Sequence, residues 1–123
     1  MRHQYDYPSL LSVLGNSETA MYGYNTMLKL GYNCVHVFYK DFAIATVTEF
    51  GVRTYRSSMT SESMKKRINS ILRPINWALV TRNDVTFLLY RPTKEVVTFN
   101  GHTMCYPSGD YADVDTKPIL NKE

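Results

Sequence analysis

Apolar residues in the first half of the chain recur at every second position, which is the spacing of a half-buried β-strand. Residues 19–30 follow this pattern and are predicted to form one long strand. Two β-branched and aromatic runs follow at 34–39 and 42–48, separated only by two residues, the length of a tight hairpin loop. With a fourth run at 52–55, the pattern predicts an antiparallel meander. A short helix at 8–14, starting at Ser9, is predicted to precede it.

The spacing changes to that of an α-helix after Thr60. The apolar side chains then fall on one stripe: Met64, Ile68, Ile71, Leu72 and Ile75. Thr60 or Ser58 can cap the start of this helix, and Pro74 stops its regular hydrogen bonding. The sequence therefore predicts one main amphipathic helix from Ser61 to Arg73, packed by its apolar stripe on one face of a sheet.

Strand spacing returns after the helix, at 77–81, 85–90, 95–99 and 102–106. Asn100-Gly101 lies between the last two runs and predicts a hairpin there, because both residues tolerate positive φ. The fold class that follows is α+β: a single domain over residues 1–123, with an antiparallel twisted sheet of about six or seven strands. The polar segment 107–123 is predicted to be a loosely ordered tail.

Composition agrees with one folded domain, since 44% of the 123 residues are hydrophobic and 20% are charged. The net charge of +3 excludes a DNA mimic, which needs a dense acidic surface. The start of the chain resembles neither a secretory signal nor a membrane span, so no membrane partner is expected. The two cysteines lack metal or redox spacing and fit a reducing cytoplasm.

Positive charge is concentrated in the middle of the chain. Between Arg53 and Lys94 there are nine Lys or Arg and two acids, so this segment carries +7 and the rest of the chain −4. The candidate binding residues on this basic surface are Arg53, Arg56, Lys65, Lys66, Arg67, Arg73, Arg82 and Arg91. The bland interpretation is a solvated helix face, with Glu62 offsetting Lys66.

Tyrosines near this basic segment are candidates for stacking on unpaired bases, namely Tyr24, Tyr55 and Tyr90. Tyrosine is also enriched at protein interfaces, so the same residues fit a protein partner or self-association equally well. The sequence leaves these alternatives open.

Catalytic and metal-binding motifs are absent from the sequence. Cys34, His36, His102 and Cys105 are the residues that resemble a soft-metal set, but the last two have opposite strand parity and the usual zinc spacings are missing. There is no Gly-x-Ser-x-Gly elbow, phosphate-binding glycine loop or His-Glu-x-x-His helix. We therefore expect no metal, no cofactor and no enzymatic activity.

Two short motifs resemble a family of small, uncharacterised proteins encoded by tailed bacteriophages. Tyr24-Asn25-Thr26 is similar to its Tyr-x-Thr strand core, and residues 63–69 are similar to its Thr-Thr-x-x-His-Ile-Asn-like helix start. Met64 stands where the family pattern has Thr, and Arg67 where it has His. The resemblance covers residues 14–72. It implies a viral origin and work in the cytoplasm of a bacterial host, and it implies no mechanism.

Three functional hypotheses follow. The first is a non-catalytic viral accessory protein that binds a host macromolecule, such as a component of a bacterial defence system, and modulates it by occupancy. The second is a nucleic-acid-binding module that uses the basic helix and neighbouring tyrosines. The third is a protein that binds a small nucleotide in a convergent pocket. A host protein is the preferred partner, with nucleic acid and a second copy of the chain as alternatives.

Overall fold

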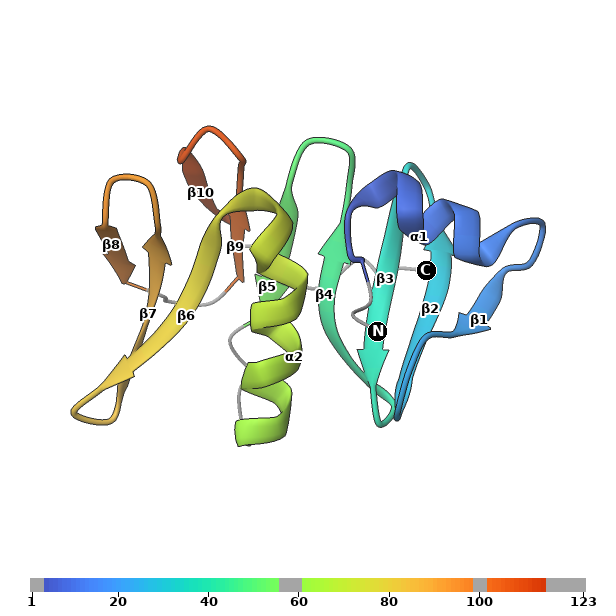
Figure 1. Ribbon diagram of the computed structural model, residues 1–123, viewed down its shortest axis with the longest axis horizontal. Helices are drawn as coiled ribbons and strands as arrows, with labels where there is room; N and C mark the ends of the chain where they lie inside the picture. Colours follow the sequence, from blue (N-terminus) through green and yellow to red (C-terminus); the bar gives the residue numbers. More distant parts are fainter. Residues whose placement is uncertain (1–3, 56–60, 99–101, 115–123) are drawn as a thin grey trace.

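The computed structural model describes residues 4–55, 61–98 and 102–114, which form an α+β domain (Figure 1). The helices are α1 (Tyr7–Leu14), α2 (Glu62–Leu72) and the 3-10 helix η2 (Arg73–Ile75). The strands are β1 (Thr19–Met21), β2 (Thr26–Gly31), β3 (Cys34–Tyr39), β4 (Phe42–Val47), β5 (Val52–Tyr55), β6 (Trp77–Arg82), β7 (Val85–Tyr90), β8 (Glu95–Thr98), β9 (His102–Cys105) and β10 (Tyr111–Val114).

The strands form two antiparallel sheets. The large sheet has the order β1-β2-β3-β4-β5-β9-β10, and the small sheet has the order β6-β7-β8. The predicted meander is confirmed from β2 to β5. The predicted long strand 19–30 is wrong, because the chain turns between β1 and β2, which pair with each other. Gly23 (φ 99°) and Asn25 (φ 54°) adopt the left-handed conformation that this turn requires.

Two further predictions about the second half need correction. β8 and β9 were expected to pair with each other, but β8 pairs with β7, and β9 lies between β5 and β10. The Asn100-Gly101 segment itself lies outside the described residues. Part of the segment that was expected to be a loose tail forms a strand, since residues 111–114 make up β10, which pairs antiparallel with β9. Backbone hydrogen bonding holds this polar strand without an apolar pattern that sequence reasoning could detect.

Both α-helices lie on the same face of the large sheet (Figure 1). The predicted stripe of α2 is confirmed, because Met64, Ile68, Ile71 and Leu72 are buried in the core together with Leu10 and Leu14 of α1. Each helix is capped by a residue other than those expected. The Ser61 side chain accepts a hydrogen bond from the Met64 amide, and the Asp6 side chain accepts one from the Ser9 amide. Thr60 and Ser58 lie outside the described residues.

Polar contacts attach the small sheet to the rest of the domain. Trp77 Nε1 donates to the Tyr106 carbonyl (2.8 Å), and the Tyr90 hydroxyl donates to the Pro107 carbonyl (2.7 Å). On the outer edge of β6, the Asn69 side chain of α2 accepts from the Leu79 amide (2.6 Å) and donates to its carbonyl (3.4 Å). The Asn69 side chain therefore satisfies the backbone N–H and C=O of Leu79 at this sheet edge. Neither α-helix in the described part of the chain has the length or apolar character needed to cross a bilayer.

Candidate functional site

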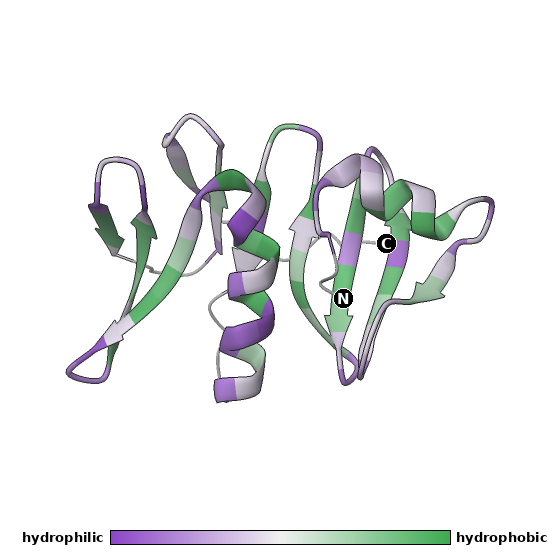
Figure 2. Cartoon of the chain, viewed as in Figure 1, coloured by the Kyte–Doolittle hydropathy of each residue, from purple (hydrophilic) through white to green (hydrophobic). Residues whose placement is uncertain are grey.

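The small sheet is apolar on both faces. Leu79, Leu88 and Val97 point toward the core, as strand alternation requires. The residues of opposite parity point away from it and are also apolar: Val80, Phe87, Leu89 and Val96. Val80 pairs with Phe87 across β6 and β7, and Leu89 pairs with Val96 across β7 and β8. Figure 2 shows the hydrophobic colouring of these strands. The register thus gathers the outward residues into one continuous apolar floor.

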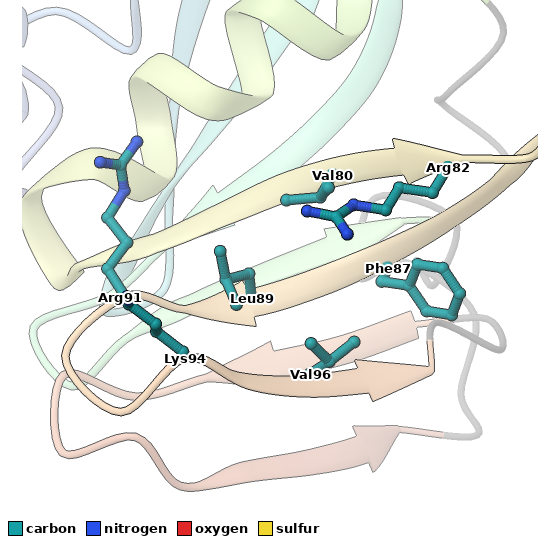
Figure 3. Close-up of a pocket in the computed structure, with 7 residues that line it drawn as sticks. All are labelled: Val80, Arg82, Phe87, Leu89, Arg91, Lys94 and Val96. Atoms are coloured by element: carbon teal, nitrogen blue, oxygen red, sulfur yellow. The ribbon is translucent and has the colours of Figure 1, made fainter.

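These residues line a groove with a volume of about 590 Å³, which also contains Arg82, Arg91 and Lys94 (Figure 3). The backbone positions of the cations lie at its two ends, but the Arg82 side chain runs back along β6 and places its guanidinium beside Val80, and the Arg91 side chain points away from the floor. Arg82 ends β6 at one end, and Arg91 and Lys94 flank the turn between β7 and β8 at the other. We call this feature the outer groove. It combines an apolar floor with basic residues that start from both ends of that floor.

The outer groove is partly open to solvent in the described structure, with Val80, Phe87 and Leu89 half-buried on its floor. Val96 is 56% exposed, and the neighbouring Val85 is 45% exposed. Arg82, Arg91 and Lys94 are all exposed. The acids nearest in sequence are Asp84 and Glu95, yet no ion pair joins them to these cations among the described residues. Within the described part of the chain, these three cations are therefore not engaged in ion pairs.

The cations of α2 are less available than the sequence suggested. Lys65 forms the one ion pair of the described residues, with Glu62 at 3.7 Å. The Arg67 guanidinium donates to the Tyr24 carbonyl (3.4 Å) and lies 5.5 Å from the centre of the Tyr39 ring. Lys66 and Arg73 remain exposed. Of the four candidate cations on α2 and η2, two are therefore exposed to solvent.

The remaining basic candidates lie elsewhere. Arg53 is half-buried on the face of the large sheet that α1 and α2 do not cover, where its register partners are Thr46 and Met104. Arg56 lies outside the described residues. The structure therefore brings together Arg82 and Arg91 from the predicted set, and it does not unite that set into one basic surface.

Only one of the three candidate tyrosines has an exposed ring. Tyr24 is 79% exposed, whereas Tyr55 and Tyr90 are 1% and 9% exposed. The Tyr90 ring packs so closely over Gly109 that a Cβ there would lie 2.6 Å from it. Tyr55 and Tyr90 are thus structural residues and do not offer a face to a base.

A chain of buried polar side chains lies on the face of the large sheet opposite α1 and α2. Cys34 Sγ lies 3.7 Å from His36 Nε2, His36 Nδ1 lies 3.0 Å from Thr46 Oγ1, and Thr46 Oγ1 bonds the Tyr55 hydroxyl. Burial raises the pKa values of Cys34 and Tyr55. Burial, with Lys29 and Arg53 nearby, lowers the pKa of His36. All three groups are thus held neutral, which disfavours the thiolate–imidazolium pair that a nucleophilic cysteine needs.

The soft-metal set is divided between two faces of the large sheet. Cys105 is fully buried in the helix-covered core, where burial raises its pKa to about 12, whereas Cys34 and His36 lie on the opposite face. No group of three or more His, Cys, Asp or Glu side chains within the described ranges is arranged to hold a metal ion.

Sequence reasoning missed the floor of the outer groove and Lys94. A signal was present, because residues 77–80 and 87–90 are apolar at both parities, as in a strand that is covered on both sides. The described structure covers one side only.

No protein-family model, curated protein or solved structure matches this chain. Functional inference therefore rests on the site itself.

Proposed function

We propose that this chain is a non-catalytic binding protein whose outer groove docks an acidic, amphipathic segment of a partner protein. The observation that carries the proposal is the uncovered apolar floor bounded at both ends by Arg82, Arg91 and Lys94. Uncovered apolar patches of this kind commonly mark interaction sites. Cations at the ends favour a partner with apolar side chains flanked by carboxylates, because complementary charge guides docking and fixes its register.

Nucleic acid fits the outer groove less well. Binding of unpaired strands uses aromatic faces on which successive bases stack. Among the described lining residues, Phe87 is the one aromatic side chain, and the rest of the floor is aliphatic. An aliphatic floor suits the Leu, Val or Phe side chains of a protein.

A second copy of the chain fits less well too. A two-fold symmetric dimer would place the groove of one protomer against the same groove of its partner. Arg82, Arg91 and Lys94 would then face identical cations across the interface, which is unfavourable. A different, acidic partner removes this conflict.

The setting of this interaction follows from the resemblance to tailed-phage proteins. Under the proposal the partner is a protein of the bacterial host, met in the cytoplasm, and binding changes the partner's activity by occupying its surface. The buried, neutral Cys34–His36 pair supports a non-catalytic role, since nucleophilic catalysis requires an activated and accessible thiol.

Site-specific photo-crosslinking tests the proposal. A photoreactive amino acid replaces Val96 on the groove floor in one sample and Tyr32, which is 92% exposed in the turn between β2 and β3, in the matched control. Each protein is expressed in bacteria and illuminated, and the products are identified by mass spectrometry. The proposal expects position 96 to capture a defined protein segment with flanking acids and apolar residues, and position 32 to capture none.

Other outcomes overturn the proposal. Equal labelling from both positions would mean that the groove has no preference for a partner. Crosslinks to nucleic acid, or to a second copy of the chain, would assign the groove to those partners instead. Absence of any crosslink from position 96 would remove the groove as a docking site.

A further inference from the structure

We propose that the partner segment binds the outer groove as an α-helix laid along the strands, with acidic residues at both of its ends. This inference rests on the proposed function and adds the conformation of the bound segment. It follows from how this domain covers its other apolar sheet face, from the geometry of the floor, and from the positions of the three cations.

The domain itself shows how an apolar face of an antiparallel sheet is covered. The large sheet is covered by α2, an 11-residue helix that buries Met64, Ile68, Ile71 and Leu72. In Figure 1 the axis of α2 runs roughly along β4 and β5. The outer groove offers a comparable face without a helix. An amphipathic helix is the element that sheet faces most often receive in two-layer α+β domains.

An extended segment would leave most of the floor uncovered. Added to the sheet as a fourth strand, it would pair with the outer edge of β8, because Asn69 of α2 already occupies the edge of β6. At about 4.8 Å per strand it would lie about 10 Å from β7 and about 14 Å from β6. Phe87 and Val80 belong to those two strands, and their half-buried side chains would gain no cover from such a strand. A helix lying over the face contacts all three strands at once.

The spacing of the cations sets the length of the helix. Arg82 is opposite Val85 in the register, and Arg91 follows β7 at its other end. From residue 85 to residue 91 an extended chain spans about 20 Å. At 1.5 Å per residue, a helix of about 13 residues covers that distance. Acidic residues at its two ends would then reach Arg82 at one end and Arg91 and Lys94 at the other.

Two synthetic peptides of about 14 residues test this inference. The first, acetyl-EELAQLLAQLAQEE-amide, places leucines at helical spacing between acidic ends. The second, acetyl-EELQLALALQAQEE-amide, has the same composition and charge but places the leucines at strand spacing. Binding of each to the full chain is measured by calorimetry. Peptide helicity is followed by circular dichroism after subtraction of the protein signal.

We expect the helical-period peptide to bind at least about tenfold more tightly than the strand-period peptide, because it alone presents every leucine to the floor as a helix. Its helicity should rise on binding. Its affinity should fall in Arg82→Glu/Arg91→Glu and in Val96→Asp. It should persist in Lys66→Glu/Arg73→Glu, which changes the net charge by the same amount on α2 and η2.

The two proposals fail in different ways. Equal or tighter binding of the strand-period peptide, still sensitive to the groove variants, would overturn the helix and leave the docking function standing. Binding of neither peptide, or binding unaffected by the groove variants, would count against the docking function as well. Circular dichroism of each variant verifies that the domain has folded, and Val96→Asp supplies an independent test if the double variant does not fold.

Discussion

The two sheets of this domain carry similar apolar faces, but the helices cover only the face of the large sheet. The large sheet turns Leu28, Val35 and Val37 toward α1 and α2, and all three are fully buried. The small sheet turns Val80, Phe87, Leu89 and Val96 outward, and no described element covers them. The same residue types therefore serve stability in one sheet and stay available for binding in the other.

The charges divide in the same way. Near the helix-covered sheet, Lys65 and Arg67 are engaged by Glu62, Tyr24 and Tyr39 of the same chain. Around the outer groove, the cations are exposed and no described acid pairs with them. A basic segment of sequence is thus a poor guide to a basic surface, because tertiary contacts decide which charges remain available.

A carboxylate placed on each apolar face should give the largest difference in unfolding free energy between the two regions. Ile68→Asp places a carboxylate in the fully buried stripe of α2 and should unfold the protein or cost at least about 4 kcal/mol of unfolding free energy. Val96→Asp puts the same charge on a side chain that is 56% exposed and should cost no more than about 1 kcal/mol. Urea unfolding followed by circular dichroism measures both. A Val96→Asp protein as unstable as Ile68→Asp would show that the outer floor is a core.

Substitution at the edge of the small sheet should have the next largest effect on the unfolding free energy. Asn69→Ala leaves the Leu79 amide without its side-chain acceptor and should lower the unfolding free energy by about 1–3 kcal/mol. Ser70→Ala is the matched control on the same helix, because it removes a hydroxyl whose one described bond is to the Lys66 carbonyl (3.2 Å). Its effect should stay below about 0.5 kcal/mol. Equal losses in the two variants would mean that Asn69 does not secure β6.

Acid should weaken the large sheet while leaving the groove charges intact. The pKa of His36 is lowered in the folded protein by burial and by Lys29 and Arg53. The unfolded chain therefore binds the proton more readily, and stability falls as the pH drops below the ordinary histidine value of 6.5. In His36→Gln this part of the pH dependence should disappear. Unfolding free energies measured from pH 7.5 to 5 test it, and identical slopes in both proteins would contradict it.

Sequence patterns were sufficient where a single period was decisive. The apolar stripe of α2 and strands β2 to β5 follow directly from spacings of 3.6 and 2 residues, and they are confirmed. The alternating pattern concealed the break between β1 and β2, because the turn at Gly23 and Asn25 lies inside an alternating run.

Hydrophobic spacing could not predict which distant segments pair with each other. Alternation shows that residues 95–99 and 102–106 favour strands, but it does not show that β8 and β9 belong to different sheets. The outer groove depends on that separation. Arg82 and Arg91 were in the predicted basic set, yet their shared groove with Lys94 and Val96 required the register of β6, β7 and β8.

The most direct test of the account compares two charge reversals against the partner captured from position 96. Arg82→Glu/Arg91→Glu and Lys66→Glu/Arg73→Glu each lower the net charge from +3 to −1, so they differ only in which region they alter. Calorimetric titration should show at least about a tenfold loss of affinity for the groove variant and little change for the helix variant. Equal loss in both, or a loss confined to the helix variant, would contradict the assignment of binding to the outer groove.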